Sequence, residues 1–99
     1  MHRIYFLCAH RSYQIEIEFY GTAAETVRES RWHPNQKFTS KPDGRTVMSL
    51  SLRSLYEIKS WVLSFGSQAR VLKPSLLVRM VREELQSAAK LYRQKNDTT

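Results

Sequence analysis

The chain has 99 residues, enough for one domain with one modest core, which excludes doubly wound dinucleotide folds, TIM barrels and kinases. Its hydrophobic fraction of 41% and aromatic fraction of 11% are ordinary for a globular protein, so disordered and fibrous classes are also excluded. The 16 Lys and Arg residues outnumber the 9 Asp and Glu residues, giving a net charge of +7. Such a charge favours a polyanionic partner, nucleic acid first and an anionic membrane second, although many small soluble domains are basic without binding either.

The cysteine content and the N-terminal residues bear on the cellular compartment. Cys8 is the one cysteine, which excludes an internal disulfide and a cysteine-rich zinc site and fits a reducing cytosol. The apolar run that begins at Ile4 stops at His10, too early for a signal peptide, and no stretch approaches the roughly 20 apolar residues of a membrane span. We therefore expect a cytoplasmic protein that is neither exported nor inserted in a membrane.

The first predicted element is a strand over 13–20, where apolar and polar residues alternate strictly. Its buried face is expected to hold Tyr13, Ile15, Ile17 and Phe19. Gly21 ends the strand. Thr22 and Glu25 have the spacing of a capping box, so a short helix is expected over 23–29.

A hairpin is predicted next. The segment Arg31-Trp32-His33-Pro34-Asn35-Gln36 is typical of a turn, and a short strand is expected over 36–40. Lys41-Pro42-Asp43-Gly44 is a strong turn signal that leads into a second alternating strand over 45–52. The inward face of that strand is expected to hold Met48, Leu50 and Leu52.

Two more helices and a strand complete the chain. Ser54 and Glu57 repeat the capping-box spacing and open a helix with the apolar stripe Leu55, Ile58, Trp61, Val62 and Phe65. Gly66 suits the left-handed position after its end. A brief strand over 69–73 follows, and Pro74 is placed in the first turn of a long last helix. The apolar stripe of that helix is Leu77, Val81, Leu85, Ala88 and Tyr92.

The element order predicts the fold class. Strand, helix, strand, strand, helix and strand give an α+β, ferredoxin-like βαββαβ domain, here with an added C-terminal helix. The domain is expected to span 13–94. Residues 1–12 are expected to form an extra edge strand or the remnant of a linker from an upstream domain, and 95–99 a frayed tail.

No group of residues in the sequence forms a recognisable catalytic or metal site. His2, His10 and His33 have no partner at metal-ligand spacing, and the phosphate-binding and nucleophile motifs are absent. Glu16 and Glu18 share a face of the first strand, but such a pair is typical of the solvated face of an open sheet. We therefore expect no enzymatic activity, no cofactor and no metal.

Basic residues on the last helix suggest a nucleic-acid surface. The spacing of three and four residues places one set on a common face: Arg79, Arg82, Gln86, Lys90 and Arg93. This stripe fits a phosphate backbone, and Arg70 and Lys73 would extend it if their strand lies beside the helix. The alternative is a solvated helix face that Glu83 and Glu84 partly neutralise.

Two further segments bear on ligand contact. The predicted strand over 45–52 lacks the aromatic pair with which RNA-recognition domains stack bases, so stacking on the sheet is not expected. Trp32 and His33 precede Pro34 in a connection. Either Trp32 closes the end of the sheet and His33 bonds a backbone carbonyl, or the pair contacts a ligand.

Several short segments also follow one another in a specific order. They are R-W-H-P-N-Q over 31–36, D-G over 43–44, W-V-L-S-F-G over 61–66, A-R-V-L-K-P-S-L-L over 69–77, and then Glu84-Leu85 and Tyr92. Across 13–92 this set resembles the C-terminal extension domain, called WCX, of WYL-domain transcriptional regulators. In such bacterial regulators a helix-turn-helix reads DNA, the WYL domain senses a ligand thought to be nucleic acid, and the WCX domain follows.

The resemblance implies a non-enzymatic module that contributes to homodimerisation and to the sensing of a single-stranded nucleic-acid effector. Together with the basic stripe it gives the candidate effector-binding residues Arg70, Lys73, Arg79, Arg82, Arg93 and His33. Its motif residues, expected to be structural, are Trp32, Pro34, Gln36, Trp61, Gly66 and Pro74. The sequence has no helix-turn-helix and no W-Y-L segment, so DNA would be read by a domain that is missing here. A purely structural dimerisation domain and a small-molecule sensor remain the alternatives.

Overall fold

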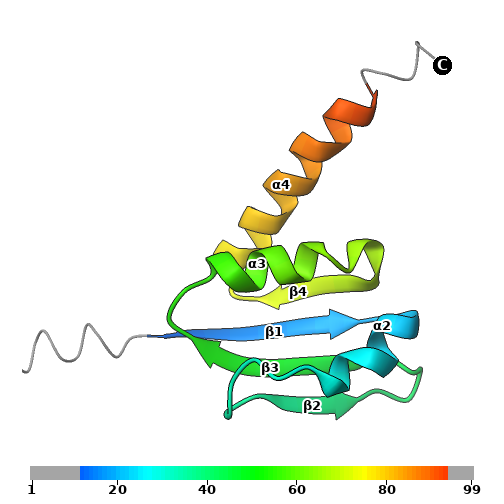
Figure 1. Cartoon of the computed structure of the whole chain (residues 1–99), viewed down its shortest axis with the longest axis vertical. Coiled ribbons are helices and arrows are strands. Elements are labelled where there is room, and N and C mark those ends of the chain that lie inside the picture. The colour runs from blue at the N-terminus through cyan, green and yellow to red at the C-terminus, as the bar shows by residue number, and fades with distance from the viewer. Residues whose placement is uncertain (1–11, 94–99) are drawn as a thin grey trace, which may run out of the picture.

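The computed structural model describes residues 12–93, and in this part of the chain one antiparallel sheet carries two helices on one face and a long helix at the C-terminal end (Figure 1). The elements are β1 (Tyr13–Phe19), α2 (Gly21–Thr26), β2 (Lys37–Ser40), β3 (Thr46–Leu52), α3 (Tyr56–Leu63), β4 (Ala69–Lys73) and α4 (Ser75–Arg93), with 3-10 turns at Val27–Glu29 and Gly66–Gln68. The strand order β2-β3-β1-β4 is that of a ferredoxin-like sheet, so the predicted fold class is confirmed. The expected edge strand or linker over 1–12, except for Ser12, and the tail over 95–99 lie outside the described residues.

The central strand β1 pairs with β3 on one side and with β4 on the other. The alternation in β1 predicted one buried face, and the structure confirms it for three residues. Ile15, Ile17 and Phe19 are each no more than 1% exposed and form the middle of the core. Met48 of β3 lies opposite Ile17 and is also fully buried. Tyr13, at the start of β1, is instead 38% exposed because it lies at the end of the sheet.

The predicted hairpin forms between β2 and β3. The backbone N–H of Lys41 donates to the carbonyl of Arg45 (2.8 Å), and the N–H of Gly44 donates to the carbonyl of Lys41 (3.0 Å). Gly44 has a φ of +94°, a backbone conformation that favours glycine. The turn therefore depends only on residues that are neighbours in the sequence, which is why the sequence alone predicts it.

Both helices on the core side of the sheet cover the same face. Ala23 and Ala24 of α2 and Ile58 and Val62 of α3 belong to the same buried cluster as the β1 side chains. The small alanines let α2 approach the sheet closely. Within 12–93 no helix covers the opposite face of the sheet, so its polar residues are available for contacts with one another or with a partner.

The two predicted capping boxes do not form. The position before α2 is Tyr20 and the position before α3 is Leu55, and neither makes a side-chain capping bond. Tertiary contacts replace the caps at α2, where the side-chain oxygen of Gln68 accepts from the N–H of Ala23 (3.2 Å). At α3, Ser54 Oγ accepts only a long bond from the N–H of Tyr56 (3.4 Å).

Helix α4 is anchored at its beginning and projects from the body at its end (Figure 1). It begins at Ser75, so Pro74 lies one residue before the helix and not in its first turn. Leu77 is fully buried in the core, whereas Leu85 is 48% and Tyr92 is 80% exposed. The apolar stripe of this helix is thus covered by the body only in its first half.

Candidate nucleic-acid interface

A groove of about 370 Å³ runs between the edge strand β4 and helix α4. Its floor is apolar and is formed by Val71, Val78, Val81, Leu85 and Ala89. The groove exists because the chain turns back at Pro74, so that α4 passes beside β4. Its volume lies within the range of small-ligand sites.

Three arginines line this groove: Arg70 on β4, and Arg82 and Arg93 on α4. All three are exposed, and none has an ion-pair partner among the described residues. The structure therefore shows that β4 lies beside α4, which the pattern of residues alone did not establish. An apolar floor with guanidinium groups around it suits a ligand that has both apolar surface and negative charge.

The spacing of the arginines bears on the size of the ligand. Arg82 and Arg93 are separated by three turns of helix, about 16 Å along the axis. Such a separation suits phosphates two or three nucleotides apart on one strand better than one isolated phosphate group. Gln86, between them, adds a side-chain amide that can donate to or accept from a base or a sugar.

Two candidate residues on α4 and β4 lie outside the groove. Arg79 is exposed on α4 but does not line the groove. Lys73, at the end of β4, contacts Glu16 through an ion pair of 3.7 Å. The basic stripe is therefore split, since its inner edge lines the groove and its outer edge is exposed to solvent.

His33 is separated from the groove by the length of the sheet. It lines a different hollow with Asn35 and Ser51, and Ser51 pairs with the beginning of β1, whereas Arg70 pairs with Glu18 near the end of β1. Its Nδ1 accepts a bond from the N–H of Asn35 (3.3 Å), so it satisfies a backbone donor and not the backbone carbonyl that the sequence suggested. The structure does not bring His33 together with the arginines.

The segment around His33 is organised by Gln36. Its Oε1 accepts from the N–H groups of Trp32 (2.6 Å) and His33 (3.1 Å), and its Nε2 donates to the carbonyl of Ser30 (2.7 Å). Trp32 packs against Trp61 with ring centroids 5.4 Å apart. These contacts show how the W-H-P-N-Q segment closes on itself and is held against α3.

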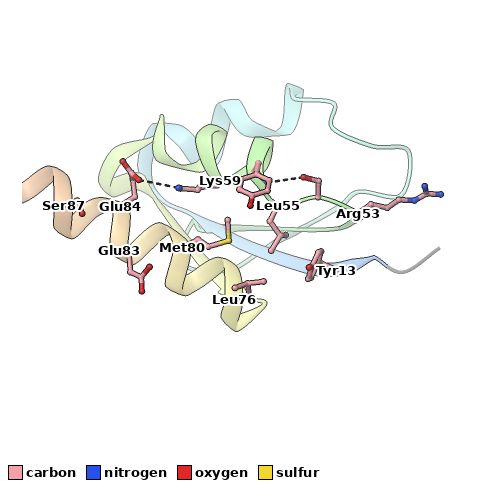
Figure 2. A pocket seen from close by; sticks show the side chains of 11 residues that line it. Tyr13, Arg53, Leu55, Lys59, Leu76, Met80, Glu83, Glu84 and Ser87 are labelled. Atoms are coloured by element: carbon pink, nitrogen blue, oxygen red, sulfur yellow. Dashed lines mark hydrogen bonds and ion pairs between the residues drawn. The ribbon is translucent and has the colours of Figure 1, made fainter. Parts of the chain in front are cut away.

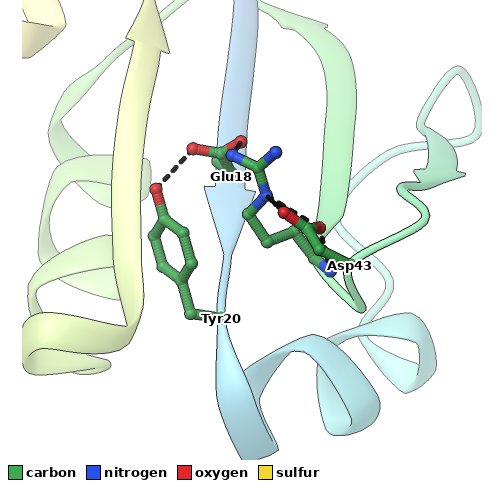
Figure 3. Close-up of polar contacts among 4 residues, drawn as sticks. Glu18, Tyr20 and Asp43 are labelled. Carbon is green, nitrogen blue, oxygen red and sulfur yellow. Dashed lines mark hydrogen bonds and ion pairs between the residues drawn. The ribbon is translucent and has the colours of Figure 1, made fainter.

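A polar network on the uncovered face of the sheet was not anticipated (Figure 3). Glu18 is only 6% exposed, which corrects the expectation that Glu16 and Glu18 form a simple solvated pair. Its carboxylate accepts from Arg45 (2.8 Å) and from the hydroxyl of Tyr20, and Arg45 also pairs with Asp43 (2.8 Å). The sequence carries no signal for this network, because Arg45 is 27 residues away from Glu18.

The network shifts the proton affinity of its members. The hydrogen bond to Glu18 is the main cause that raises the pKa of Tyr20 above its usual value of 10.0. The hydrogen bonds from Arg45 lower the pKa of Asp43, and the same contact raises the pKa of Arg45. Arg70 lies close enough to Tyr20 to oppose the rise in its pKa, so the network adjoins the strand that lines the groove.

A second hollow, of about 660 Å³, lies between the beginning of β1, the start of α3 and one side of α4 (Figure 2). Tyr13, Leu55 and Met80 give it apolar surface, and an ion pair between Lys59 and Glu84 (3.4 Å) crosses one side of it. Its charged residues are of both signs. This hollow therefore shows no preference for an anionic ligand, in contrast to the groove.

Neither a metal cluster nor a membrane helix is found in the part of the chain that the structure describes. Over 12–93, no three His, Cys, Asp or Glu residues are grouped so that they could hold a metal ion. In the same residues no helix combines the length and the apolar character needed to cross a bilayer.

The fold and the groove place the chain among small ferredoxin-like α+β domains with an added C-terminal helix. The family model of the WCX domain matches residues 11–89, and the chain belongs to this family. WCX domains are regulatory domains of WYL-type proteins. Among curated proteins, no sequence matches the chain.

Proposed function

We propose that this WCX domain is a non-enzymatic module of a WYL-type transcriptional regulator that binds a single-stranded nucleic-acid effector and contributes to dimerisation. The observation that carries the effector part is the groove between β4 and α4, with Arg70, Arg82 and Arg93 around an apolar floor. The base of a nucleotide would lie on the floor and the phosphates would face the guanidinium groups. DNA would be read by a helix-turn-helix domain, which this sequence does not contain.

Fluorescence anisotropy with a labelled single-stranded oligonucleotide tests the effector part. The variant Arg70→Ala/Arg82→Ala/Arg93→Ala is expected to bind more weakly and to lose about 2 from the slope of log K against log salt, since each single-strand phosphate contact contributes about 0.7. Binding by the parent that does not depend on salt would contradict the proposal.

A matched variant separates the groove from net charge. Arg31→Ala/Arg53→Ala/Arg79→Ala removes the same number of exposed arginines, none of which lines the groove. It is expected to retain most of the affinity. Equal losses in both triple variants would mean that the oligonucleotide responds only to the overall positive charge of the domain.

One observation favours the alternative of a small-molecule sensor. The floor of the groove is formed by aliphatic side chains and could hold an apolar ligand with a single acidic group. A mononucleotide or a fatty acid that displaces the labelled oligonucleotide as efficiently as an unlabelled strand does would support this alternative. The 16 Å span of the arginines argues for the longer ligand, because one acidic group meets only one end of it.

The dimerisation part is supported by the exposed apolar residues at the end of α4. Leu85, Leu91 and Tyr92 are between 48% and 80% exposed, and apolar groups gathered in this way are typical of surfaces that bind another protein. Sedimentation velocity over a concentration series of the 99-residue chain tests it. A dimer in the absence of nucleic acid is the expected result, and a dimer that neither binds oligonucleotide nor responds to it would favour a purely structural role.

A further inference from the structure

The hollow of about 660 Å³ between the beginning of β1, the start of α3 and α4 is long as well as large (Figure 2). Leu76, Met80, Glu83 and Ser87 line it from α4 at steps of four, three and four residues, so they share one face of the helix. From Leu76 to Ser87 the helix advances about 16 Å. An extended peptide of about five residues spans the same length.

The apolar surface of this hollow is partly open to solvent. Tyr13, Tyr56 and Leu76 all line it and are between 36% and 75% exposed. Met80 lies in the middle of the hollow, and its unbranched side chain can adapt its shape to a ligand. Exposed apolar side chains gathered around a concave surface are typical of a binding site.

The charges that line the hollow are separated by sign. Glu84 pairs with Lys59 (3.4 Å), whereas Glu83 and Arg53 form no ion pair with any residue in 12–93. Figure 2 shows Arg53 at one end of the hollow and Glu83 at the other, with Met80 between them. One end therefore offers a guanidinium group and the other end a carboxylate, both free to bind a ligand.

The length and the charges of the hollow together define the chemistry of its ligand. A complementary ligand carries a cationic group near Glu83, an anionic group near Arg53 and apolar groups between the two. A free α-amino acid does not fit, because its two charged groups are attached to the same carbon atom. A peptide with a basic and an acidic side chain several residues apart fits both the length and the charges.

We propose that this hollow binds an extended segment of a partner protein, about five residues long, in which a basic and an acidic side chain flank apolar ones. The hollow and the groove between β4 and α4 have no lining residue in common. They use different faces of α4, since Met80 and Glu83 line the hollow whereas Arg82 and Leu85 line the groove. Peptide binding in the hollow is therefore independent of the proposed nucleic-acid effector.

NMR titration of the 99-residue chain with short peptides, acetylated and amidated at their ends, tests the site. The probe is K-L-V-L-D, and its control L-K-D-V-L has the same composition and net charge but adjacent charges. The probe is expected to bind about threefold or more tightly, because only its charges reach both ends of the hollow. The amide signals of Leu55, Met80 and Ser87 should shift, and that of Val71 in the groove should not. Equal affinities, signals that shift in the groove instead, or no binding at the highest concentration reached would each overturn the proposal.

A charge reversal in the protein tests which end binds which group. Arg53→Glu is expected to bind K-L-V-L-D about threefold or more weakly and K-L-V-L-K more tightly than the parent does, because the new carboxylate repels an acid and attracts a lysine. Arg79→Glu is the matched control, since it changes the net charge equally at an exposed position of α4 that lines neither the hollow nor the groove. The amide spectrum of each variant verifies that it is folded. Equal changes in the two variants would mean that the peptides respond only to net charge, and the proposal would then be wrong.

Discussion

At the scale of residues, the surroundings of a side chain determine its role more than its type does. Glu16 and Glu18 are identical in type and share one face of β1. Yet Glu16 makes one long ion pair with Lys73, whereas Glu18 is nearly buried and is bonded by both Arg45 and Tyr20. A carboxylate with so little solvent access requires such partners, because an unpaired buried charge is strongly unfavourable.

The Tyr20 contact makes stability depend on pH in the alkaline range. Its pKa is raised in the folded protein, so the folded state holds this proton more tightly than the unfolded chain. The contribution of the contact is intact below the usual pKa of 10.0 and is lost as the pH rises through the raised value. Tyr20→Phe is expected to cost about 1 kcal/mol at pH 7, typical of one hydrogen bond.

Urea unfolding at pH 7 and above pH 10 measures this difference. The gap in unfolding free energy between the parent and Tyr20→Phe should narrow at the higher pH. Tyr56→Phe, at a residue that is 75% exposed, serves as the control and should leave stability unchanged at both values. A gap that stays constant or widens with pH would contradict the role assigned to the Tyr20 hydroxyl.

At the scale of elements, α4 combines two functions along one helix. Its beginning is part of the core, since Leu77 is fully buried. Arg82 in its middle and Arg93 at its end line the groove, and its last turns carry the exposed Leu85, Leu91 and Tyr92. The roughly five contiguous turns of this helix are therefore under different physical constraints. The first half stabilises the domain, and the second half presents a surface.

Truncation of leucines along α4 distinguishes the two halves. Leu77→Ala should lower the free energy of unfolding by about 2–5 kcal/mol, because it leaves a cavity in a packed core. Leu85→Ala, at a side chain that is 48% exposed, should change the stability of the monomer by less than about 1 kcal/mol. Thermal or urea unfolding at a concentration below dimer formation measures both. Similar losses would mean that the body covers more of α4 than the structure shows.

At the scale of the whole molecule, the groove and the exposed apolar residues at the end of α4, Leu85, Leu91 and Tyr92, share one residue. Leu85 lines the groove and is also one of these exposed apolar residues. A ligand that covers Leu85 therefore competes with a second copy for this side chain. The proposed effector and the proposed dimer are therefore expected to be linked, and the linkage is reciprocal.

Sedimentation with and without a saturating oligonucleotide tests this linkage. The effector is expected to shift the chain toward monomer, and dimerisation should weaken oligonucleotide binding by the same factor. Arg70→Ala is the control, because Arg70 lines the groove on β4 but lies outside α4, so the dimer should persist and respond less to the oligonucleotide. A dimer that is strengthened by the oligonucleotide would show that the two surfaces cooperate instead of competing.

The sequence by itself determined the features that local chemistry specifies. Alternation over β1 and β3, the Pro-Asp-Gly turn and the spacing of apolar residues in α3 and α4 each depend on neighbouring residues, and together they were enough for the fold class. The ordered motifs were also enough for the family, whose model matches residues 11–89. The prediction of helix caps was wrong at α2. The capping bond was expected from a side chain next to the helix, but the distant Gln68 accepts the bond from the N–H of Ala23.

Only the tertiary structure decided which basic residues lie together and which carboxylate is buried. Arg70 meets Arg82 and Arg93 because the chain reverses between β4 and α4, whereas His33 remains at the other end of the sheet. The net charge of +7 is a total over the chain, so it does not say where the charged residues lie in the structure. A groove, a buried Glu18 and an uncovered half of α4 arise from the packing of elements distant in sequence, and periodicity within one element cannot specify that packing.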